Sequence, residues 1–435
     1  MKKMKILELF GGIGACSKAL ERLGIEYEIA DYVEIDKYAV KSFNAIHNTN
    51  FEPQDICEWD KDIEVDLIMH GSPCQDFSLA GKQAGGDKDS GTRSSLMYET
   101  IRIVEKLKPK YVIWENVKNL LSKKHIHNFN AYLETMEQLG YTNYYQVLNA
   151  KDYGIPQNRE RVFTISILNI EFLGEQENSF VPITDFKFPP KQELKLKLKD
   201  MLEDEVDEKY YLSDKMLNYI VADNEKWTGN NSKSVINKKI ASVINTGEGQ
   251  RRCDASNYVS DNFNDDYNLK QLLCNKLIKE NKVKESDVIR HSYSSSRMKN
   301  MYTQNSKNNN ISPTLDTRCD CLGVCVKIKN NTKKGYLEAY PGDGVYTNTS
   351  TKRGTVQSQT IQTITTFQDK GVVLEDLRIR KLTPKECWRL MGFDDSDYEK
   401  ASKVNSNAQL YKQAGNSIVV NVLEAILKQL LGGEK

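Results

Sequence analysis

The first 168 residues alternate short apolar runs with segments whose apolar residues recur at helical spacing. The runs have the length of buried strands, and the segments between them have the length of helices. Strands are expected at residues 5–10, 27–36, 65–71, 110–117 and 161–168, and helices at 16–24, 37–48, 94–109 and 128–140. This alternation is typical of βαβ units, so it predicts an α/β domain with a mostly parallel sheet. Such sheets bind ligands in the crevice beyond the carboxyl ends of their strands.

The chain changes character near residue 180, where a proline pair and dense mixed charge indicate a hinge. The residues that follow are rich in Asn, Ser, Thr, Lys and Tyr, and short β-like pieces lie between polar loops. This composition predicts a second domain, mostly β or irregular, that is suited to surface recognition. The expected boundaries are residues 1–185 for the first domain, 190–376 for the second, and 377–435 for C-terminal helices that return to complete the first.

Two helices are predicted in the C-terminal stretch. Thr383 is placed to cap a helix that has Pro384 at its first position and Glu386 in its first turn. Residues 413–432 are expected to form a loop followed by a helix that ends at Gly432.

Composition limits the class of protein. A formal net charge of +1 over 435 residues gives no overall polybasic character, so any contact with nucleic acid depends on a local basic surface. No apolar stretch approaches the roughly 20 residues that span a bilayer, and the N-terminus lacks a signal-peptide pattern, so a cytoplasmic protein without a membrane partner is expected. Nine scattered cysteines fit a reduced compartment. Cys319, Cys321 and Cys325 have the wrong spacing for a zinc knuckle, so we expect no metal and a strand that carries buried thiols.

A glycine-rich turn, FGGIG, lies between the first expected strand and helix at residues 10–14. Glycines there allow a tight turn and a close approach of the backbone to a ligand. A dinucleotide fingerprint needs a further glycine where this chain has Ser17, while Glu34 ends the second strand and can accept from ribose hydroxyls. The pattern therefore suggests a nucleoside cofactor without a diphosphate, such as S-adenosylmethionine. A tight strand–helix turn without a ligand is the alternative interpretation.

Further polar residues occur at the ends of other expected strands. Cys74 follows the strand at 65–71, Glu115 follows KYVIW, and Arg159 and Arg161 begin the strand at 161–168. Because strand ends of a parallel sheet converge on one crevice, a thiol, a carboxyl group and a guanidinium can meet there. A thiolate is a strong nucleophile, and a carboxyl group shielded from water can keep its proton near neutral pH. This set is suited to attack at C6 of cytosine with protonation at N3, which activates C5 toward methylation.

These motifs together resemble the DNA (cytosine-5)-methyltransferases, and they occur in that family's order. FGGIG resembles the cofactor loop, GSPCQDFS the nucleophile loop, GTRSSLMYE the segment after it, ENV the acid motif, QNRERV the basic motif, and RKLTPKECWRLMGF with YKQAGNSIVVNVL the two closing motifs. The resemblance covers about residues 4–168 and 377–431. It implies a Rossmann-like, S-adenosylmethionine-dependent methyltransferase sheet, and it implies that the variable region between the motifs is a target-recognition domain.

The resemblance also implies roles for single residues. In catalysis it implies Cys74 as the nucleophile, Glu115 as the acid, and Arg159 and Arg161 beside the flipped base. It implies cofactor contacts from the loop, the second strand and the later motifs, namely Phe10, Gly12, Ile13, Gly14, Glu34, Ile35, Asp55, Ile56, Pro73 and Asn416. Ile35 departs from the aromatic residue that stacks on adenine in some relatives. It implies DNA contacts from Gln75 and Ser78 when the nucleophile loop closes.

The expected function is a sequence-specific DNA cytosine-5 methyltransferase, in restriction–modification or in protection of host or phage DNA. Double-stranded DNA is the expected partner, a cognate restriction endonuclease is expected to act separately, and the enzyme is expected to be a monomer. Methylation of tRNA is the alternative, although the branch of the family that does so has a short variable region. A DNA-binding protein without catalysis is disfavoured by the intact set of Cys74, Glu115 and Arg161, and an NAD-dependent oxidoreductase is disfavoured by Ser17.

Overall fold

The chain forms two compact units. The computed structural model describes residues 3–73, 96–169, 186–213, 216–217, 240–243, 288–289, 325–333, 335–347, 354–374 and 378–432. Unit 1 comprises Met1–Asp204, Gln362–Gln368 and Thr383–Lys435, and unit 2 comprises Glu205–Ile361 and Asp369–Leu382. The chain therefore passes from one unit to the other several times.

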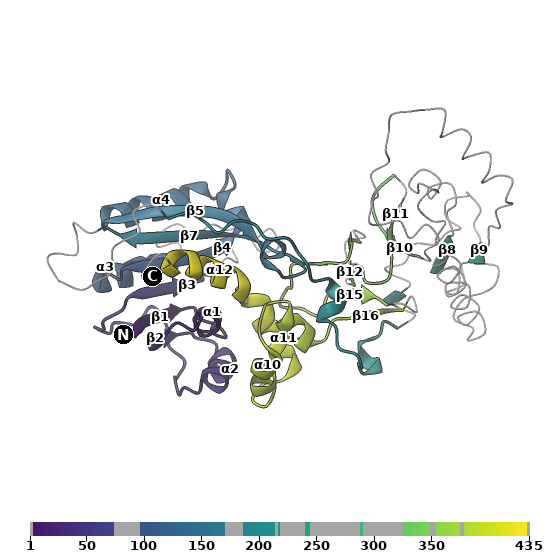
Figure 1. The fold of residues 1–435 in the computed structure, drawn as a ribbon, viewed down its shortest axis with the longest axis horizontal. Helices are drawn as coiled ribbons and strands as arrows, with labels where there is room; N and C mark the ends of the chain where they lie inside the picture. Colours follow the sequence, from purple (N-terminus) through teal and green to yellow (C-terminus); the bar gives the residue numbers. More distant parts are fainter. Residues whose placement is uncertain are drawn as a thin grey trace. The chain divides into compact units, whose positions relative to one another are not determined.

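Unit 1 is built on a six-stranded sheet in the order β2-β1-β3-β4-β7-β5 (Figure 1). Its strands are β1 (Met4–Leu9), β2 (Tyr27–Val33), β3 (Leu67–His70), β4 (Tyr111–Val117), β5 (Tyr141–Asn149) and β7 (Glu160–Leu168). β2, β1, β3 and β4 pair in parallel, whereas β7 is antiparallel to both β4 and β5. The predicted α/β fold with a mostly parallel sheet is confirmed; β7 is the strand that runs antiparallel, and β5 was not predicted.

Helices cover both faces of this sheet, namely α1 (Ala15–Leu23) and α2 (Lys37–His47) on one face and α3 (Met97–Leu107) and α4 (Ile126–Gln138) on the other. The C-terminal helices are α9 (Pro384–Arg389), α10 (Asp395–Ser402), α11 (Asn407–Asn416) and α12 (Val420–Leu431). α9, α10 and α11 pack on one another, α10 and α11 also contact α2, and α12 packs against α1. Leu7 and Leu9 of β1 join an apolar core with residues of α3 and α4. Because side chains alternate along a strand, Glu8 points to the opposite face, where it contacts Ser17 of α1.

Local signals explain where several helices begin and end. The Asp36 side chain accepts a hydrogen bond from the Tyr38 amide and caps α2, and Gly24 ends α1 in the left-handed conformation. Thr383 and Glu386 form the predicted capping box of α9, and α12 ends before Gly432 as predicted. Residues 413–416 are the last turn of α11 rather than the expected loop.

Unit 2 contains small sheets. One has the order β11-β10-β8-β9 and another the order β13-β12-β15-β16. The strands are β8 (Ile240–Val243), β9 (Val288–Ile289), β10 (Cys325–Lys329), β11 (Tyr336–Ala339), β12 (Gly344–Tyr346), β13 (Val356–Gln357), β15 (Lys370–Val373) and β16 (Ile379–Lys381). Two further short strands are β6 (Gln157–Asn158) and β14 (Ile361–Gln362). Cys325 is a buried thiol on β10, as expected, while Cys319 and Cys321 lie outside the described residues.

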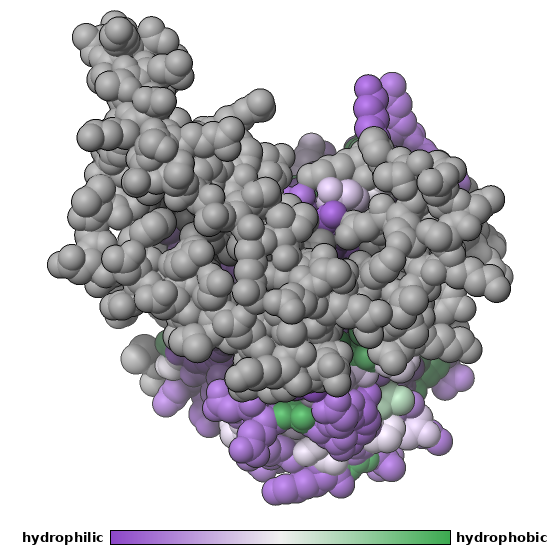
Figure 2. All heavy atoms as spheres, turned by 90° about the vertical axis from the view of Figure 1, so that its right-hand side faces the viewer, coloured by the Kyte–Doolittle hydropathy of each residue, from purple (hydrophilic) through white to green (hydrophobic). Residues whose placement is uncertain are grey.

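Unit 2 has a small apolar core of its own, formed by Leu212, Val326, Ile328, Ala339, Val345, Val373 and Ile379. On the face shown in Figure 2, the described residues are largely hydrophilic, with separate apolar patches between them. Among the described residues, no helix combines the length and the apolarity that crossing a membrane requires.

Candidate active site

The glycine-rich loop connects β1 to α1 through an unusual backbone path. Phe10, Gly12 and Gly14 all have positive φ angles, of 53°, 56° and 80°. A Cβ on Gly14 would lie 2.3 Å from Nε2 of His47, so a side chain is excluded there by space as well as by conformation. A Cβ on Gly12 would meet nothing within 4 Å, so the loop presents bare backbone to open space at this point.

The end of β2 lies beside this loop. The Gly12 amide donates to Oε2 of Glu34 at 3.2 Å, and the Asp36 amide donates to Oε1 at 2.9 Å. Ile35 lies between Glu34 and Asp36 in the sequence, and its side chain is 68% exposed, which is high for an isoleucine. A half-buried carboxyl group next to an exposed aliphatic side chain offers hydrogen bonding and apolar contact to one ligand.

Two further segments reach this edge of the sheet. The Gln54 amide donates to the Glu34 carbonyl at 2.9 Å, and this places Asp55 and the buried Ile56 next to the end of β2. Lys412 of α11 pairs with Asp36 at 2.6 Å, and Gln413 bonds Ser42 of α2 at 2.9 Å. These contacts bring α11, which ends at Asn416, against α2.

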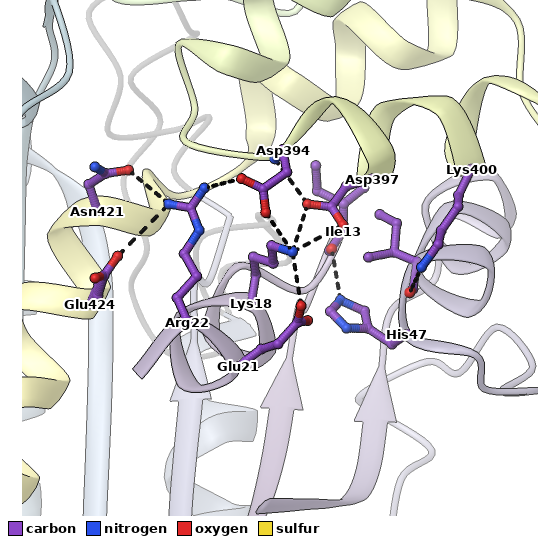
Figure 3. A network of polar contacts seen from close by, with 11 residues as sticks. Ile13, Lys18, Glu21, Arg22, His47, Asp394, Asp397, Lys400, Asn421 and Glu424 are labelled. Carbon is purple, nitrogen blue, oxygen red and sulfur yellow. Dashed lines mark hydrogen bonds and ion pairs between the residues drawn. The ribbon is translucent and has the colours of Figure 1, made fainter. Parts of the chain in front are cut away.

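A partly buried cluster of charges fastens α1 to the C-terminal helices (Figure 3). Lys18 is 4% exposed, and its Nζ lies 3.1 Å from Glu21, 2.9 Å from Asp394 and 3.1 Å from Asp397. Arg22 adds a contact of 2.6 Å to Asp394. Burial lowers the pKa of Lys18, but the surrounding carboxylates outweigh burial and raise it above its usual value. The helix that follows the loop is thus held by residues from the far end of the chain.

The other half of the site begins where β3 ends. The Ser72 hydroxyl accepts from Trp114 Nε1 at 3.0 Å, and the Ser72 carbonyl accepts from Asn116 Nδ2 at 3.4 Å. Both donors belong to β4, so the backbone next to Pro73 is held by the neighbouring strand. Cys74, Gln75 and Ser78 follow directly in the sequence and lie outside the described residues.

Glu115 lies between the two residues that hold Ser72, and its carboxyl group points toward the end of β3. A Cβ placed on Gly71 would lie 3.9 Å from its Oε2. Arg161 of β7 approaches from the other side, with Nε 3.0 Å from Oε1. This contact is an ion pair, and within the described structure Oε1 accepts no hydrogen bond of good geometry. The carboxyl group therefore retains the capacity to bond a ligand.

Burial controls the charge of this carboxyl group. Glu115 is 9% exposed, and burial raises its pKa above the usual value, while Arg161 and Arg159 pull it down without cancelling the effect. Burial favours the protonated form, because removing a carboxylate from water is costly. The group can therefore donate a proton or a strong hydrogen bond closer to neutral pH than an ordinary glutamate.

Arg159 contacts backbone instead of facing open space. It is 4% exposed, and its guanidinium donates to the carbonyls of Ile364, Gly415 and Ser417 at 3.0, 3.2 and 2.7 Å. These bonds favour a role in assembling unit 1 over direct contact with a base. Arg161, in contrast, is next to Glu115.

The sequence analysis missed the roles of Trp114 and Ser72. A tryptophan inside an apolar strand is typical of a core residue, and nothing in the local pattern indicates that its indole N–H reaches a loop. Among the described residues, no group of three or more His, Cys, Asp or Glu side chains is arranged to hold a metal.

Comparisons with known proteins identify the family of this chain. The model of the family described as C-5 cytosine-specific DNA methylase matches residues 4–432. An orphan methyltransferase, M.SPRI, of Bacillus phage SPR is 31% identical over 99% of this chain and 98% of its own length. A type II methyltransferase, M2.ScrFI, of Lactococcus lactis subsp. cremoris is 30% identical over 98% of this chain and 99% of its own length.

Solved structures support the same fold. The methyltransferase EhMeth of Entamoeba histolytica superposes with a TM-score of 0.53 at 14% identity, and each chain is covered in full. A DNA modification methyltransferase encoded within an E. coli prophage, described as putative in its title, has a TM-score of 0.51 at 18% identity and covers 99% of this chain. The extent of the family match and the full-length relatives show that the chain belongs to the C-5 cytosine-specific DNA methylase family and has DNA (cytosine-5)-methyltransferase activity.

Proposed function

We propose that this enzyme methylates cytosine in a specific DNA sequence by flipping the base out of the duplex and forming a covalent adduct between Cys74 and C6. The observation that carries the proposal is Glu115, a buried carboxyl group with a raised pKa beside the end of β3 and next to Arg161. A protonated acid at this point is what attack on a cytosine ring requires, because N3 must gain a proton as C6 gains a nucleophile.

The proposed reaction begins and ends with a free thiolate on Cys74. The thiolate of Cys74 forms a C–S bond to C6, the C5–C6 double bond becomes electron density at C5, and N3 takes the proton of Glu115. S-Adenosylmethionine supplies the methyl group that C5 receives. The proton on C5 then leaves to water, the C–S bond breaks, the proton on N3 returns to Glu115, and the thiolate is regenerated.

Arg161 supports this acid. Its Nε stays within 3.0 Å of one carboxyl oxygen, so it fixes the direction in which the carboxyl group points. We propose that the same guanidinium holds O2 of the base, which would keep N3 in front of Glu115.

The residues around the loop fit S-adenosylmethionine, which the family uses. Gly12 offers backbone to open space, Glu34 supplies a carboxylate for ribose hydroxyls, and Ile35 is an exposed apolar surface for a purine ring. We propose that Phe10, Ile13, Gly14, Asp55, Ile56, Pro73 and Asn416 complete this site.

The region at 190–376 is proposed to recognise the DNA target. Its polar composition and small core fit a surface that reads base edges while basic residues hold phosphates. Flipping the base costs a few kcal/mol, which contacts of this kind would offset. The relatives include orphan phage enzymes and type II enzymes, so we propose a role in phage DNA protection or in restriction–modification.

The test uses the full chain with tritiated cofactor and three substrates: methylation-free duplex DNA, duplex DNA with 5-methylcytosine, and tRNA. Transfer to unmodified DNA alone is expected. A DNA duplex with 5-fluorocytosine in place of cytosine should trap the wild-type enzyme as an adduct that survives denaturing electrophoresis, because the fluorine cannot leave C5 as a proton does.

Two variants separate the roles. Cys74→Ser should abolish transfer and the trapped adduct but keep cofactor binding. Glu115→Gln should lower kcat by about 10²- to 10⁴-fold, as expected for loss of an acid. An active Cys74→Ser enzyme, or transfer to tRNA in preference to DNA, would contradict the proposal.

A further inference from the structure

The FGGIG loop requires something to hold its backbone. Phe10 has a φ of 53°, in the left-handed region that side chains other than glycine rarely occupy. Two glycines with positive φ follow within the same turn. A backbone of this kind persists only when surrounding contacts determine it.

Tyr32 of β2 is the side chain that lies directly under this turn. It is 0% exposed, and its ring stacks on Phe43 with centroids 3.8 Å apart and an interplanar angle of 22°. The ring fills the space beside Gly11, where a Cβ would come within 2.7 Å of Tyr32 Cε2. The glycine at position 11 and the tyrosine at position 32 are therefore complementary in shape.

The hydroxyl of Tyr32 reaches past Gly11 and donates to the carbonyl of Gly12 at 2.6 Å. Glu34, two residues further along the chain and just past the end of β2, accepts from the amide of Gly12 at 3.2 Å. Both polar groups of Gly12 are thus held by the end of β2 and the residue that follows it, at the position where the loop opens to space. The next carbonyl, that of Ile13, faces His47 Nε2 at 3.4 Å (Figure 3).

We propose that Tyr32 is a positioning residue for the cofactor: its hydroxyl fixes the Gly12 carbonyl so that the loop already has its binding conformation before the cofactor arrives. The inference rests on the proposed assignment of this loop to S-adenosylmethionine. Without the hydroxyl, the Gly12–Ile13 peptide loses the side-chain donor that holds it within the described structure, and it can rotate. Binding must then order the loop, which weakens affinity without altering the methyl-transfer step.

The test is Tyr32→Phe in the full chain, which keeps the buried ring and removes one oxygen. Calorimetry with S-adenosylhomocysteine, without DNA, should show a dissociation constant five- to tenfold higher, which corresponds to about 1 to 1.4 kcal/mol. The KM for S-adenosylmethionine should rise by a similar factor, while kcat at saturating cofactor and the KM for DNA stay within twofold. Hydrogen exchange in the peptide that covers residues 10–17 should be faster in the free protein.

Two controls distinguish positioning from general destabilisation. Tyr145→Phe removes the hydroxyl of a tyrosine that is 52% exposed on β5, and it should change nothing. Phe51→Leu loosens the packing of the Tyr32 ring, whose centroid lies 5.7 Å from that of Phe51, but keeps the hydroxyl. It should lower the melting temperature and leave the dissociation constant unchanged.

The outcomes separate the two proposals. If the wild-type protein does not bind S-adenosylhomocysteine, the cofactor assignment fails. If the wild type binds and Tyr32→Phe binds equally well, or if Phe51→Leu weakens binding as much as Tyr32→Phe does, the positioning role of the hydroxyl is refuted while the cofactor assignment stands.

Discussion

Glu8 makes the stability of unit 1 depend on pH near neutrality. Its side chain is 2% exposed on β1, and Oε1 accepts from the Ser17 amide at 3.0 Å and from the Ser17 hydroxyl. Burial raises its pKa to about 7 from a usual value of 4.5, although hydrogen bonds from Ser17 and Cys16 oppose the shift. The Glu8 carboxyl group thus accepts hydrogen bonds from the first turn of α1, and burial makes its charged form unfavourable.

The size of the pH effect on the free energy of unfolding follows from the difference between the pKa of Glu8 in the folded and in the unfolded chain. Between pH 4.5 and 7 the folded protein keeps a proton that the unfolded chain has lost, so the free energy of unfolding falls as pH rises. A shift from 4.5 to about 7 corresponds to about 3 kcal/mol in full. Roughly 2 to 3 kcal/mol of this should be lost between pH 5 and 8, and the loss should be complete above the folded pKa.

Glu8→Gln removes the titration but keeps an oxygen that can accept from Ser17. Urea unfolding at several pH values, followed by tryptophan fluorescence, reports on unit 1 because Trp59, Trp114 and Trp388 are all buried there. The variant should gain about 2 to 3 kcal/mol over the wild type as pH rises from 5 to 8. Glu28→Gln, at an exposed position on β2, is the matched control. Parallel pH profiles for the wild type and Glu8→Gln would refute the reasoning.

Two other substitutions test how the loop and α1 are held. Lys18→Met removes the cation that Glu21, Asp394 and Asp397 share and leaves Arg22 beside Asp394 alone, so it should destabilise unit 1 by about 3 kcal/mol in urea unfolding, whereas Lys41→Met at an exposed position should have little effect. If Lys18→Met unfolds in urea as the wild type does, the cluster contributes little to the stability of unit 1. Gly14→Ala combines a φ of 80° with a clash against His47, so it should weaken S-adenosylhomocysteine binding at least tenfold in calorimetry; unchanged affinity would mean that the loop tolerates a different path.

The sequence predicted those elements whose signals are local. Apolar periodicity, Gly24 and the Thr383 box located the helices and strands that bury one face. Strand direction is a different matter, because an apolar run has the same pattern in either orientation. The sequence therefore predicted a mostly parallel sheet but not which strand runs the other way. The antiparallel course of β7 is what brings its first residues, including Arg161, to the edge where β4 ends.

Elements that depend on distant partners were missed for the same physical reason. β5 carries Thr142, Asn143 and Gln146 among its tyrosines, and as an edge strand it has no simple alternation of buried and exposed residues. Residues 413–416 resembled a loop because they contain Gly415. In the structure a Cβ at Gly415 would lie 2.4 Å from the backbone of Thr365 and Thr366, so glycine is required there by close packing and the helix continues through it.

The bonds of Arg159 also set an order in time. The carbonyls that it holds belong to residues 205 to 258 positions further along the chain. At a synthesis rate of about 5–20 residues per second, these partners leave the ribosome about 10 to 50 seconds after the arginine does. Asp394 and Asp397, the partners of Lys18, are still further along the chain from it and are synthesised after a longer interval. A nascent chain can therefore form the central strands early, but it acquires the contacts that hold Lys18 of α1 and Arg159 only after these later residues have been made.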